Sequence, residues 1–473
     1  MNDKNNQIDV KNVTGAVRSH RPTDDGHIYV RAQKGQWQRL RKLMGWFFML
    51  LFVVGPWLTW NNRQAILLDV EQQRFHIFGS TIWPQDLTLL ALLFVVAAFG
   101  LFFITTFLGR VWCGYLCPQT VWTFLFIWFE EKFEGSANKR RQLDKSSWNF
   151  NKLWRKSAKH AAWLAVSLFT GFTFIAYFVP AVELGLGLLT FSASFWPVFW
   201  VLFFAFCTYG NAGWMRTIMC THMCPYSRFQ SAMFDKDTYT VSYDVERGEQ
   251  RGPRPRKKDP KELGLGDCID CDMCVQVCPA GIDIRDGLQY ECINCGACVD
   301  ACDQTMERMG YENGLISYTT EHKLRHKETH VARPKLIGYG VVMVIMLAAF
   351  VYMAANIMPL GVEVIRDRNQ LYRETAEGLV ENTYTLKIIN KTLEAETYQL
   401  KVDGVDELEW IGPTEVTVSG GEVFTLPISL SADPYLLSSP VQDITFVVTR
   451  AGAAPDERKS GARNESKFFG SAR

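Results

Sequence analysis

The sequence predicts a multi-domain membrane protein: a five-helix α transmembrane domain, an inserted cytoplasmic α+β domain, and a C-terminal all-β sandwich of the immunoglobulin-like type. Three observations predict this fold class. Long apolar runs alternate with charged segments, two runs of four cysteines precede the last apolar run, and the C-terminal region alternates polar and apolar residues. The average composition hides this division, because 48% hydrophobic residues and a net charge of +1 also suit a soluble protein.

Residues 1–36 are polar and contain no secretory signal pattern, so we expect a mobile cytoplasmic arm. Five apolar runs without a charged side chain follow, each close to the length of about 20 residues that crosses a bilayer. They are Leu43–Trp60, Leu87–Leu108, Ala161–Val182, Phe195–Gly213 and Leu336–Leu360. A sixth run, Thr120–Phe129, is too short to span, and its tryptophans suit an interfacial or re-entrant helix.

Lysine and arginine residues set the expected orientation. Segments 31–42 and 139–159 are rich in both, whereas 61–86 contains only two and 183–194 contains none. Positive residues favour the cytoplasmic side, so the sequence predicts a bacterial inner-membrane protein with a cytoplasmic N-terminus and a periplasmic C-terminus. The expected domains are the first four spans at 37–226, a cytoplasmic domain with a linker helix at 227–335, and the last span at 336–360.

The region after Leu360 reads as short strands with turn residues between them, which predicts the periplasmic sandwich at 361–453. This region contains neither Cys nor His, so scaffolding or partner binding is the expected role rather than redox chemistry. We expect residues 454–473 to be a disordered tail.

Eight cysteines form two runs of identical spacing, Cys-x2-Cys-x2-Cys-x3-Cys. This is the pattern of bacterial two-cluster ferredoxins, in which the fourth cysteine of each run binds the other cluster. It predicts a ferredoxin-like domain with two [4Fe–4S] clusters. The expected ligands are Cys268, Cys271, Cys274 and Cys302 for the first cluster, and Cys292, Cys295, Cys298 and Cys278 for the second.

The alternative for these eight cysteines is a pair of structural zinc sites, against which the x3 step and Pro279 argue. Pro279 and Gly296 suit the expected turns. The second run carries Asp303 where a proline often stands, a change that removes no ligand.

A Cys-x3-Cys-Pro motif occurs twice, at Cys113–Pro118 and at Cys220–Pro225, after the second and fourth spans. The four thiols can therefore meet at one depth. The proline suits the first position of a helix, which would place Cys117 and Cys224 at helix N-termini, where the dipole favours a thiolate. Four thiolates with the adjacent His222 and Met223 form a soft ligand set that favours Cu(I). Thiols that merely pack, or a structural zinc ion, are the alternatives.

Four other residues invite a metal role. Cys207 lies alone within the fourth span, and we expect it to pack rather than bind. His322, His326 and His330 recur every four residues, which predicts one face of a helix leading into the last span. Neighbouring basic residues favour a solvated stripe facing lipid headgroups, with chelation by His322 and His326 as the alternative.

Taken together, these motifs resemble the cytochrome c oxidase accessory proteins of the CcoG family, also called FixG or Rdx, over about residues 30–450. The resemblance implies reduction of Cu(II) to Cu(I) for assembly of the cbb3-type cytochrome oxidase. It also implies that the catalytic, copper-handling residues are Cys113, Cys117, Cys220 and Cys224. Copper itself comes from the resemblance, since the spacing predicts only metal-capable thiols beside an electron-transfer domain.

The expected activity is therefore that of a cupric reductase, with copper ions, copper carriers and oxidase assembly factors as partners. No G-x-G-x-x-G motif follows a strand, which leaves the electron donor open between a cytoplasmic protein and membrane quinol. One alternative is a quinol-linked electron relay with a quinone-sized pocket among the spans. Another is a non-enzymatic copper chaperone or assembly scaffold. A homodimer is left open, and no nucleic acid partner is expected.

Overall fold

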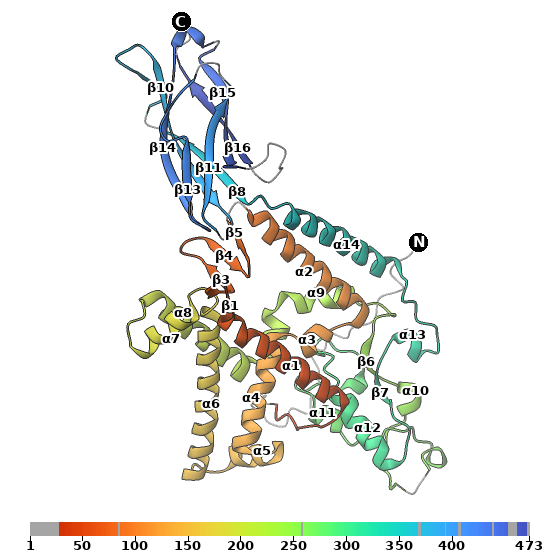
Figure 1. Cartoon of the computed structure of the whole chain (residues 1–473). Coiled ribbons are helices and arrows are strands. Elements are labelled where there is room, and N and C mark those ends of the chain that lie inside the picture. The colour runs from red at the N-terminus through yellow and green to blue at the C-terminus, as the bar shows by residue number, and fades with distance from the viewer. Residues whose placement is uncertain are drawn as a thin grey trace. The chain divides into compact units, whose positions relative to one another are not determined.

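The computed structural model describes residues 28–83, 86–256, 259–367, 370–392, 394–404, 408–437, 439–452 and 461–470. The chain divides into two compact units. The first comprises Met1–Leu58 with Ala91–Ala349, and the second comprises Thr59–Leu90 with Phe350–Arg473. Helices dominate the first unit and strands the second (Figure 1).

Four helices among the described residues are long and apolar enough to cross a membrane. They are α1 (Gln36–Val54) with the 3₁₀ turn Gly55–Trp57, α2 (Leu87–Leu108), α8 (Phe195–Thr208) with the π-helical segment Tyr209–Met215, and α14 (Pro334–Ala355). They match four of the five predicted spans. The predicted ends at Trp60 and Leu360 are wrong, because β1 (Thr59–Trp60) and β8 (Leu360–Arg366) occupy those positions.

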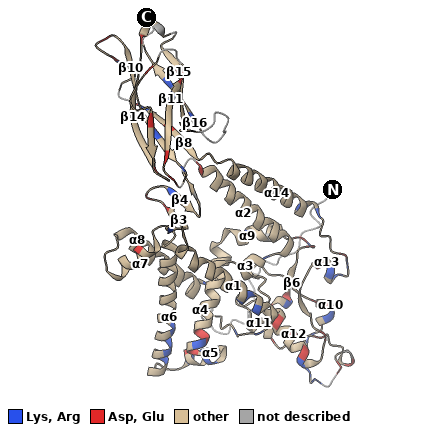
Figure 2. Ribbon diagram, viewed as in Figure 1, with Lys and Arg blue, Asp and Glu red and all other residues tan. Residues whose placement is uncertain are grey.

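The predicted third span, Ala161–Val182, is not one helix. α6 (Phe150–Ile175) starts in the basic connection, where Figure 2 shows its Lys and Arg residues, and ends at Ile175. Pro180 has no N–H and restricts the residue before it, so the chain restarts as α7 (Ala181–Leu189). α6 is not among the four candidate spans, and the five-span topology stays a prediction.

Two further helices precede α6. α4 (Pro118–Glu134) contains the short run Thr120–Phe129, and α5 (Ala137–Lys145) follows it. Inside this part, the buried carboxylate of Glu130 accepts hydrogen bonds from Arg140 and Arg216. Although burial opposes ionisation, these two arginines hold the pKa of Glu130 below its usual value.

The cysteine-rich domain is built on short elements. β6 (Thr240–Tyr243) pairs antiparallel with β7 (Ile316–Thr319), and α10 (Val245–Gly248), α11 (Met273–Gln276) and α12 (Ala297–Met309) surround the cysteine loops. Asp303 lies inside α12, where a proline would break the helix. Its carboxylate instead accepts the N–H of Gly314 at 2.9 Å, so the departure from the ferredoxin pattern keeps α12 continuous.

The described part of the N-terminal arm is packed against the protein, which contradicts the prediction of a mobile arm. Tyr29 and Val30 are buried, and Arg140 donates to the Val30 carbonyl at 2.5 Å. The N-terminus of α1 is also fixed, because the carboxylate of Asp300 accepts the N–H groups of Trp37 and Gln38 at 3.2 and 2.8 Å. A carboxylate is a favourable cap for the positive end of a helix dipole. Residues 1–27 lie outside the described residues.

The predicted sandwich is present. One sheet has the order β12 (Glu409–Ile411), β14 (Val423–Ala432), β10 (Val380–Asn390) and β8, with β9 (Arg373–Glu374) also on β10. The other has the order β13 (Glu415–Val418), β11 (Glu396–Asp403), β15 (Val441–Arg450) and β16 (Gly461–Phe469). Alternate side chains of both sheets form one apolar core.

Residues 59–83 form strands rather than only a connection. β1 pairs with β2 (Arg63–Gln64), and β3 (Ile66–Asp69), β4 (Arg74–Ile77) and β5 (Ser80–Ile82) form a small meander. Lys391 Nζ lies 2.7 and 2.9 Å from the carboxylate oxygens of Asp86, within the same unit.

The predicted disordered tail is wrong for Gly461–Phe469, which forms β16 and pairs antiparallel with β15. The polar sequence is misleading because β16 is an edge strand. Its Lys467 is exposed, whereas Phe468 is only 1% exposed in the sandwich core. Residues 454–460 and 471–473 lie outside the described residues.

Phe468→Ala should therefore destabilise the sandwich by about 3–5 kcal/mol, the cost of removing a buried aromatic side chain. Hydrogen–deuterium exchange of β15 in the full-length protein measures this. The neighbouring substitution Lys467→Ala is the control and should leave exchange unchanged. Equal protection in the two variants would contradict the placement of β16.

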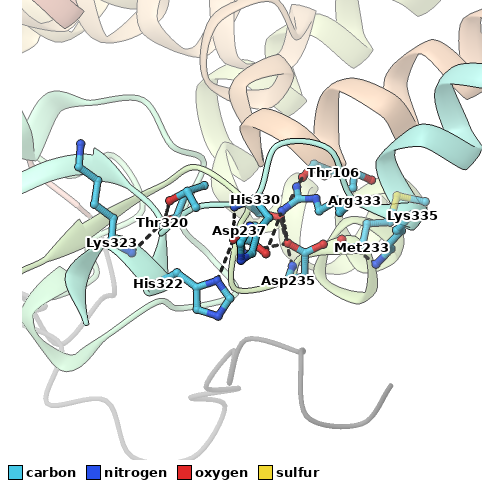
Figure 3. A network of polar contacts seen from close by, with 12 residues as sticks. Thr106, Met233, Asp235, Asp237, Thr320, His322, Lys323, His330, Arg333 and Lys335 are labelled. Atoms are coloured by element: carbon cyan, nitrogen blue, oxygen red, sulfur yellow. Dashed lines mark hydrogen bonds and ion pairs between the residues drawn. The ribbon is translucent and has the colours of Figure 1, made fainter. Parts of the chain in front are cut away.

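A buried polar network fixes the start of α14 to the cysteine-rich domain (Figure 3). Arg333 Nη1 lies 2.5 Å from the carboxylate of Asp235, and both side chains are buried. Asp237 Oδ1 accepts the backbone N–H of His330 at 3.0 Å and lies 2.7 Å from His322 Nδ1. These bonds join the segments before β6, after β7 and at the start of α14.

The predicted histidine stripe is wrong. α13 covers only Glu321–Leu324, and His326 has a left-handed backbone that ends any helix there. His322 and His330 face Asp237 instead, while the exposed His326 lies 3.3 Å from Glu246. The alternative of chelation by His322 and His326 is disfavoured, because the His322 ring lies against Asp237 whereas His326 lies beyond α13 against Glu246.

Asp237→Asn should loosen the start of α14 by about 1.5–3 kcal/mol, because it removes the charge that strengthens the bonds to His322 and His330, while Arg333 keeps Asp235. Burial raises the pKa of Asp237, but the hydrogen bonds from His330 and His322 and the charge of Arg333 outweigh burial. This pKa therefore lies below its ordinary value of 3.8. The stabilisation by Asp237 is therefore complete above pH 3.8, the pKa in the unfolded chain. It is lost only as the pH falls through the lower pKa of the folded protein. Hydrogen exchange of α14 should change in this variant and not on mild acidification. Glu246→Gln is the control, and an equal effect from it would contradict the anchoring role.

Candidate functional site

The eight cysteines of the cysteine-rich domain line two cavities, in two groups of four. One cavity is lined by Cys268, Cys271, Cys274 and Cys302. The other is lined by Cys278, Cys292, Cys295 and Cys298, and Cys274 also reaches it. Each group of four matches the set predicted for one cluster. In each, three cysteines come from one loop and the fourth from the other, as the spacing requires.

The two cysteine loops share one backbone shape. Asp270 and Asn294 occupy equivalent positions and both have a positive φ, as do Asp272 and Gly296 two residues later. Aspartate, asparagine and glycine are the residues that tolerate this left-handed conformation. The repeated conformation lets each loop wrap its three cysteines around one cavity.

The cluster cysteines are mostly buried, with Cys271 the exposed member of the eight. Burial raises the pKa of Cys274 and Cys278 to about 12 and that of Cys292 to about 11. The free thiols are therefore neutral, and metal binding must release their protons. The soft donors around each cavity fit an iron–sulfur cluster.

The two Cys-x3-Cys-Pro motifs share one arrangement, in which the first cysteine lies in a short helical segment and the second directly precedes an α-helix. In the first, Cys113 lies in α3 (Val111–Tyr115) and Cys117 precedes α4, whose first residue is Pro118. In the second, Cys220 lies in the π-helical turn Met219–Met223 and Cys224 precedes α9 (Pro225–Met233). The predicted placement of a cysteine at each helix N-terminus is confirmed.

A hydroxyl group closes each motif at the same relative position. Thr120 Oγ1 donates to the carbonyl of Cys113 at 2.6 Å, and Ser227 Oγ donates to the carbonyl of Cys220. Each hydroxyl residue stands three positions after the second cysteine of its own motif. The internal repeat noted in the sequence thus extends to the hydrogen bonds.

The four thiols of the motifs lie close enough to influence one another electrostatically. Burial and the neighbouring thiols raise the pKa of Cys113 to about 12 and that of Cys220 to about 11. Burial also raises the pKa of Cys117, so the expectation of a dipole-stabilised thiolate is wrong for that residue. Among the described residues, no three His, Cys, Asp or Glu side chains are arranged around a single metal ion.

The other predicted ligands differ in their placement. His222 and Met223 are exposed, and His222 Nδ1 lies 2.7 Å from Thr221 Oγ1, so their ligand role stays a prediction. Cys207 is partly buried on α8.

The first motif contacts the loop of the second cavity directly. A Cβ atom on Gly114 would lie 2.6 Å from the carbonyl oxygen of Ile293, so only glycine permits this approach. Cys113 packs against the apolar cluster that contains Ile293 and Cys295. Beside it, the hydroxyl groups of Tyr115 and Tyr318 lie 2.8 Å apart, and that of Tyr318 donates to the carbonyl of Asn294.

Sequence reasoning missed two residues at this contact. Gly114 was read only as part of a spacer. Gln230 is fully buried and accepts a hydrogen bond from the Cys113 thiol at 3.4 Å, while its Nε2 has no partner among the described residues. Neither could be recognised from spacing, because both roles depend on segments far apart in the chain.

Comparisons with protein families agree with this division of the molecule. Residues 215–321 match a 4Fe-4S dicluster domain, and residues 90–134, which include the first motif, match a 4Fe-4S binding domain. Residues 350–471 match the IG-like fold at the C-terminal of FixG. The chain is therefore a membrane protein with iron–sulfur domains and an immunoglobulin-like domain.

Similar proteins cover most of the chain. Protein RdxA of Cereibacter sphaeroides is 40% identical over 75% of this chain and 77% of its own length. Protein RdxB of the same organism is 38% identical over 83% of this chain and 87% of its own length. Nitrogen fixation protein FixG of Rhizobium meliloti is 34% identical over 80% of this chain and 79% of its own length.

A crystal structure of a FixG-related protein from Vibrio parahaemolyticus is 42% identical, covers 24% of this chain and 97% of that chain, and has a TM-score of 0.22. The extent and identity of the three full-length matches decide the assignment. This chain, an iron–sulfur electron-transfer protein of the membrane, belongs to the FixG/Rdx family.

Proposed function

We propose that this protein passes single electrons to the four thiols of its two Cys-x3-Cys-Pro motifs, where Cu(II) is reduced to Cu(I) for assembly of a cbb3-type oxidase. The observation that carries this proposal is the backbone contact between Gly114 and Ile293. It brings the first motif against the loop that lines the second cluster cavity. An electron leaving that cavity has a short, packed route to Cys113.

The proposed ligands are the two sets of cysteines that line the cavities. When bound, the two [4Fe–4S] clusters would supply one-electron transfer. Exposed Cys271 marks the cavity that an external donor can approach. Cys292 and Cys295 in the lining of the second cavity are buried, which keeps water away from the route towards Cys113.

The four motif thiols supply the chemistry at copper. Sulfur donors prefer Cu(I), whereas nitrogen and oxygen donors suit Cu(II), so binding at these thiols favours the reduced ion. Each Cu(II) takes up one electron from an external donor. A one-electron cytoplasmic protein would reduce one Cu(II), whereas a membrane quinol, oxidised to the quinone with release of two protons, would reduce two. Because free thiols are protonated here, copper binding also releases protons.

The proposed setting is a bacterial inner membrane, with the cysteine-rich domain in the cytoplasm and the sandwich in the periplasm. The distribution of Lys and Arg supports this orientation. Copper carriers and oxidase assembly factors are the proposed partners, and the sandwich offers a surface for one of them.

Changing Cys113, Cys117, Cys220 and Cys224 together to Ser should abolish Cu(I) formation while the clusters remain. The test mixes anaerobically reduced protein with Cu(II) and follows cluster bleaching together with a Cu(I)-specific chelator. Cys207→Ser is the matched control and should behave as the unaltered protein. Unchanged reduction in the fourfold variant would refute the role of these thiols, and no Cu(I) from any of the proteins would favour a quinol-linked relay.

Gly114→Ala should slow electron transfer to copper without removing a thiol. Its Cβ would force the first motif away from Ile293, at a cost of about 1–3 kcal/mol for overpacking. Single-turnover oxidation of the reduced clusters by Cu(II) measures the effect, with copper binding determined separately. Gly338→Ala, which adds a Cβ into open space, is the control. A normal rate in Gly114→Ala would mean that the route does not cross this contact.

A further inference from the structure

Arg110 is a buried cation at the meeting point of both motifs and the second cluster loop. It precedes α3 and is only 4% exposed. Its guanidinium donates to the carbonyl of Ser227 at 2.7 Å, to that of Cys292 at 3.4 Å, and to that of Tyr290, whose ring it also covers at 4.9 Å. One side chain therefore touches the start of α9, just after the second motif, and the loop of the second cavity.

No described carboxylate forms an ion pair with Arg110, and its Nε has no hydrogen-bond partner among the described residues. Glu291, which stands between Tyr290 and Cys292, acts on Cys292 with the opposite sign without pairing with Arg110. The other two arginines that are buried as deeply are paired: Arg140 with Glu130 at 2.6 Å, and Arg333 with Asp235 at 2.5 Å. An unpaired buried charge is costly, so a lone guanidinium needs an anion that the protein acquires.

Three thiols lie within electrostatic reach of this guanidinium. They are Cys113, Cys220 and Cys292. Arg110 thus acts on a cysteine from each motif and on one from the second cavity. Its field is strong because the surroundings are buried.

We infer that Arg110 is the counter-charge of the second cluster, and that it sets the potential at which this cluster accepts an electron. Reduction adds one negative charge to a buried centre, and a fixed cation nearby stabilises the reduced form. Arg110 acts through the cluster rather than on copper, which makes it a positioning residue. The inference rests on the proposed assignment of Cys278, Cys292, Cys295 and Cys298.

The test is a redox titration of the purified full-length protein, followed by electron paramagnetic resonance. Arg110→Gln removes the charge but keeps a hydrogen-bond donor, whereas Arg110→Lys keeps the charge without the planar fork. Cys271→Ser, at the exposed ligand of the first cluster, identifies the signal of that cluster. Arg285→Gln is the matched control, because Arg285 acts on Cys274 beside the first cavity.

Arg110→Gln should lower the equilibrium constant for reducing the second cluster at least tenfold, which is about 59 mV for one electron. The first cluster should not shift, and Arg110→Lys should keep the original potential. In contrast, Arg285→Gln should affect the first cluster.

An unchanged potential in Arg110→Gln, or an equal shift in the Gln and Lys variants, would overturn the inference. If Arg110→Gln loses its clusters, Arg110→Met, which also lacks the charge, replaces it: a lowered potential supports the role of charge, and a retained one refutes it. A wild-type protein without two [4Fe–4S] signals would instead refute the proposed function itself.

Discussion

The structure depends on a close backbone approach between the first Cys-x3-Cys-Pro motif and the loop of the second cavity. Gly114 makes the approach possible, and the contacts around it keep the two segments together. Tyr115 and Tyr318 bond on one side, and Arg110 bonds on the other. Further out, Asp300 caps α1 and the Asp237 network holds α14. The cysteine-rich domain is thereby fastened to membrane helices at several points.

The features that spacing determines could be predicted from the sequence. The two sets of cluster cysteines, the helix start after each motif and most strands of the sandwich follow from local patterns. Their physical basis is local too, since ligand loops, proline positions and alternation act within a few residues.

The remaining features depend on tertiary contacts and could not be predicted. β16 looks disordered until β15 is beside it, and His326 breaks a helix that its spacing suggests. The sequence predicts that the helix dipole favours a thiolate at Cys117, but it does not reveal the burial that raises the pKa of this thiol. Arg110 resembles any juxtamembrane arginine until the structure shows that no described carboxylate pairs with it.

The cap of α1 has a consequence for biosynthesis. Asp300 stands 262 positions after Gln38, whose N–H it accepts, so a ribosome releases the first membrane helix long before it makes the residue that completes its first turn. The amino end of α1 therefore stays open to water during translation. Its final seating must wait until α12 has folded beside the cysteines, which ties the maturation of the first membrane segment to that of the metal-binding domain.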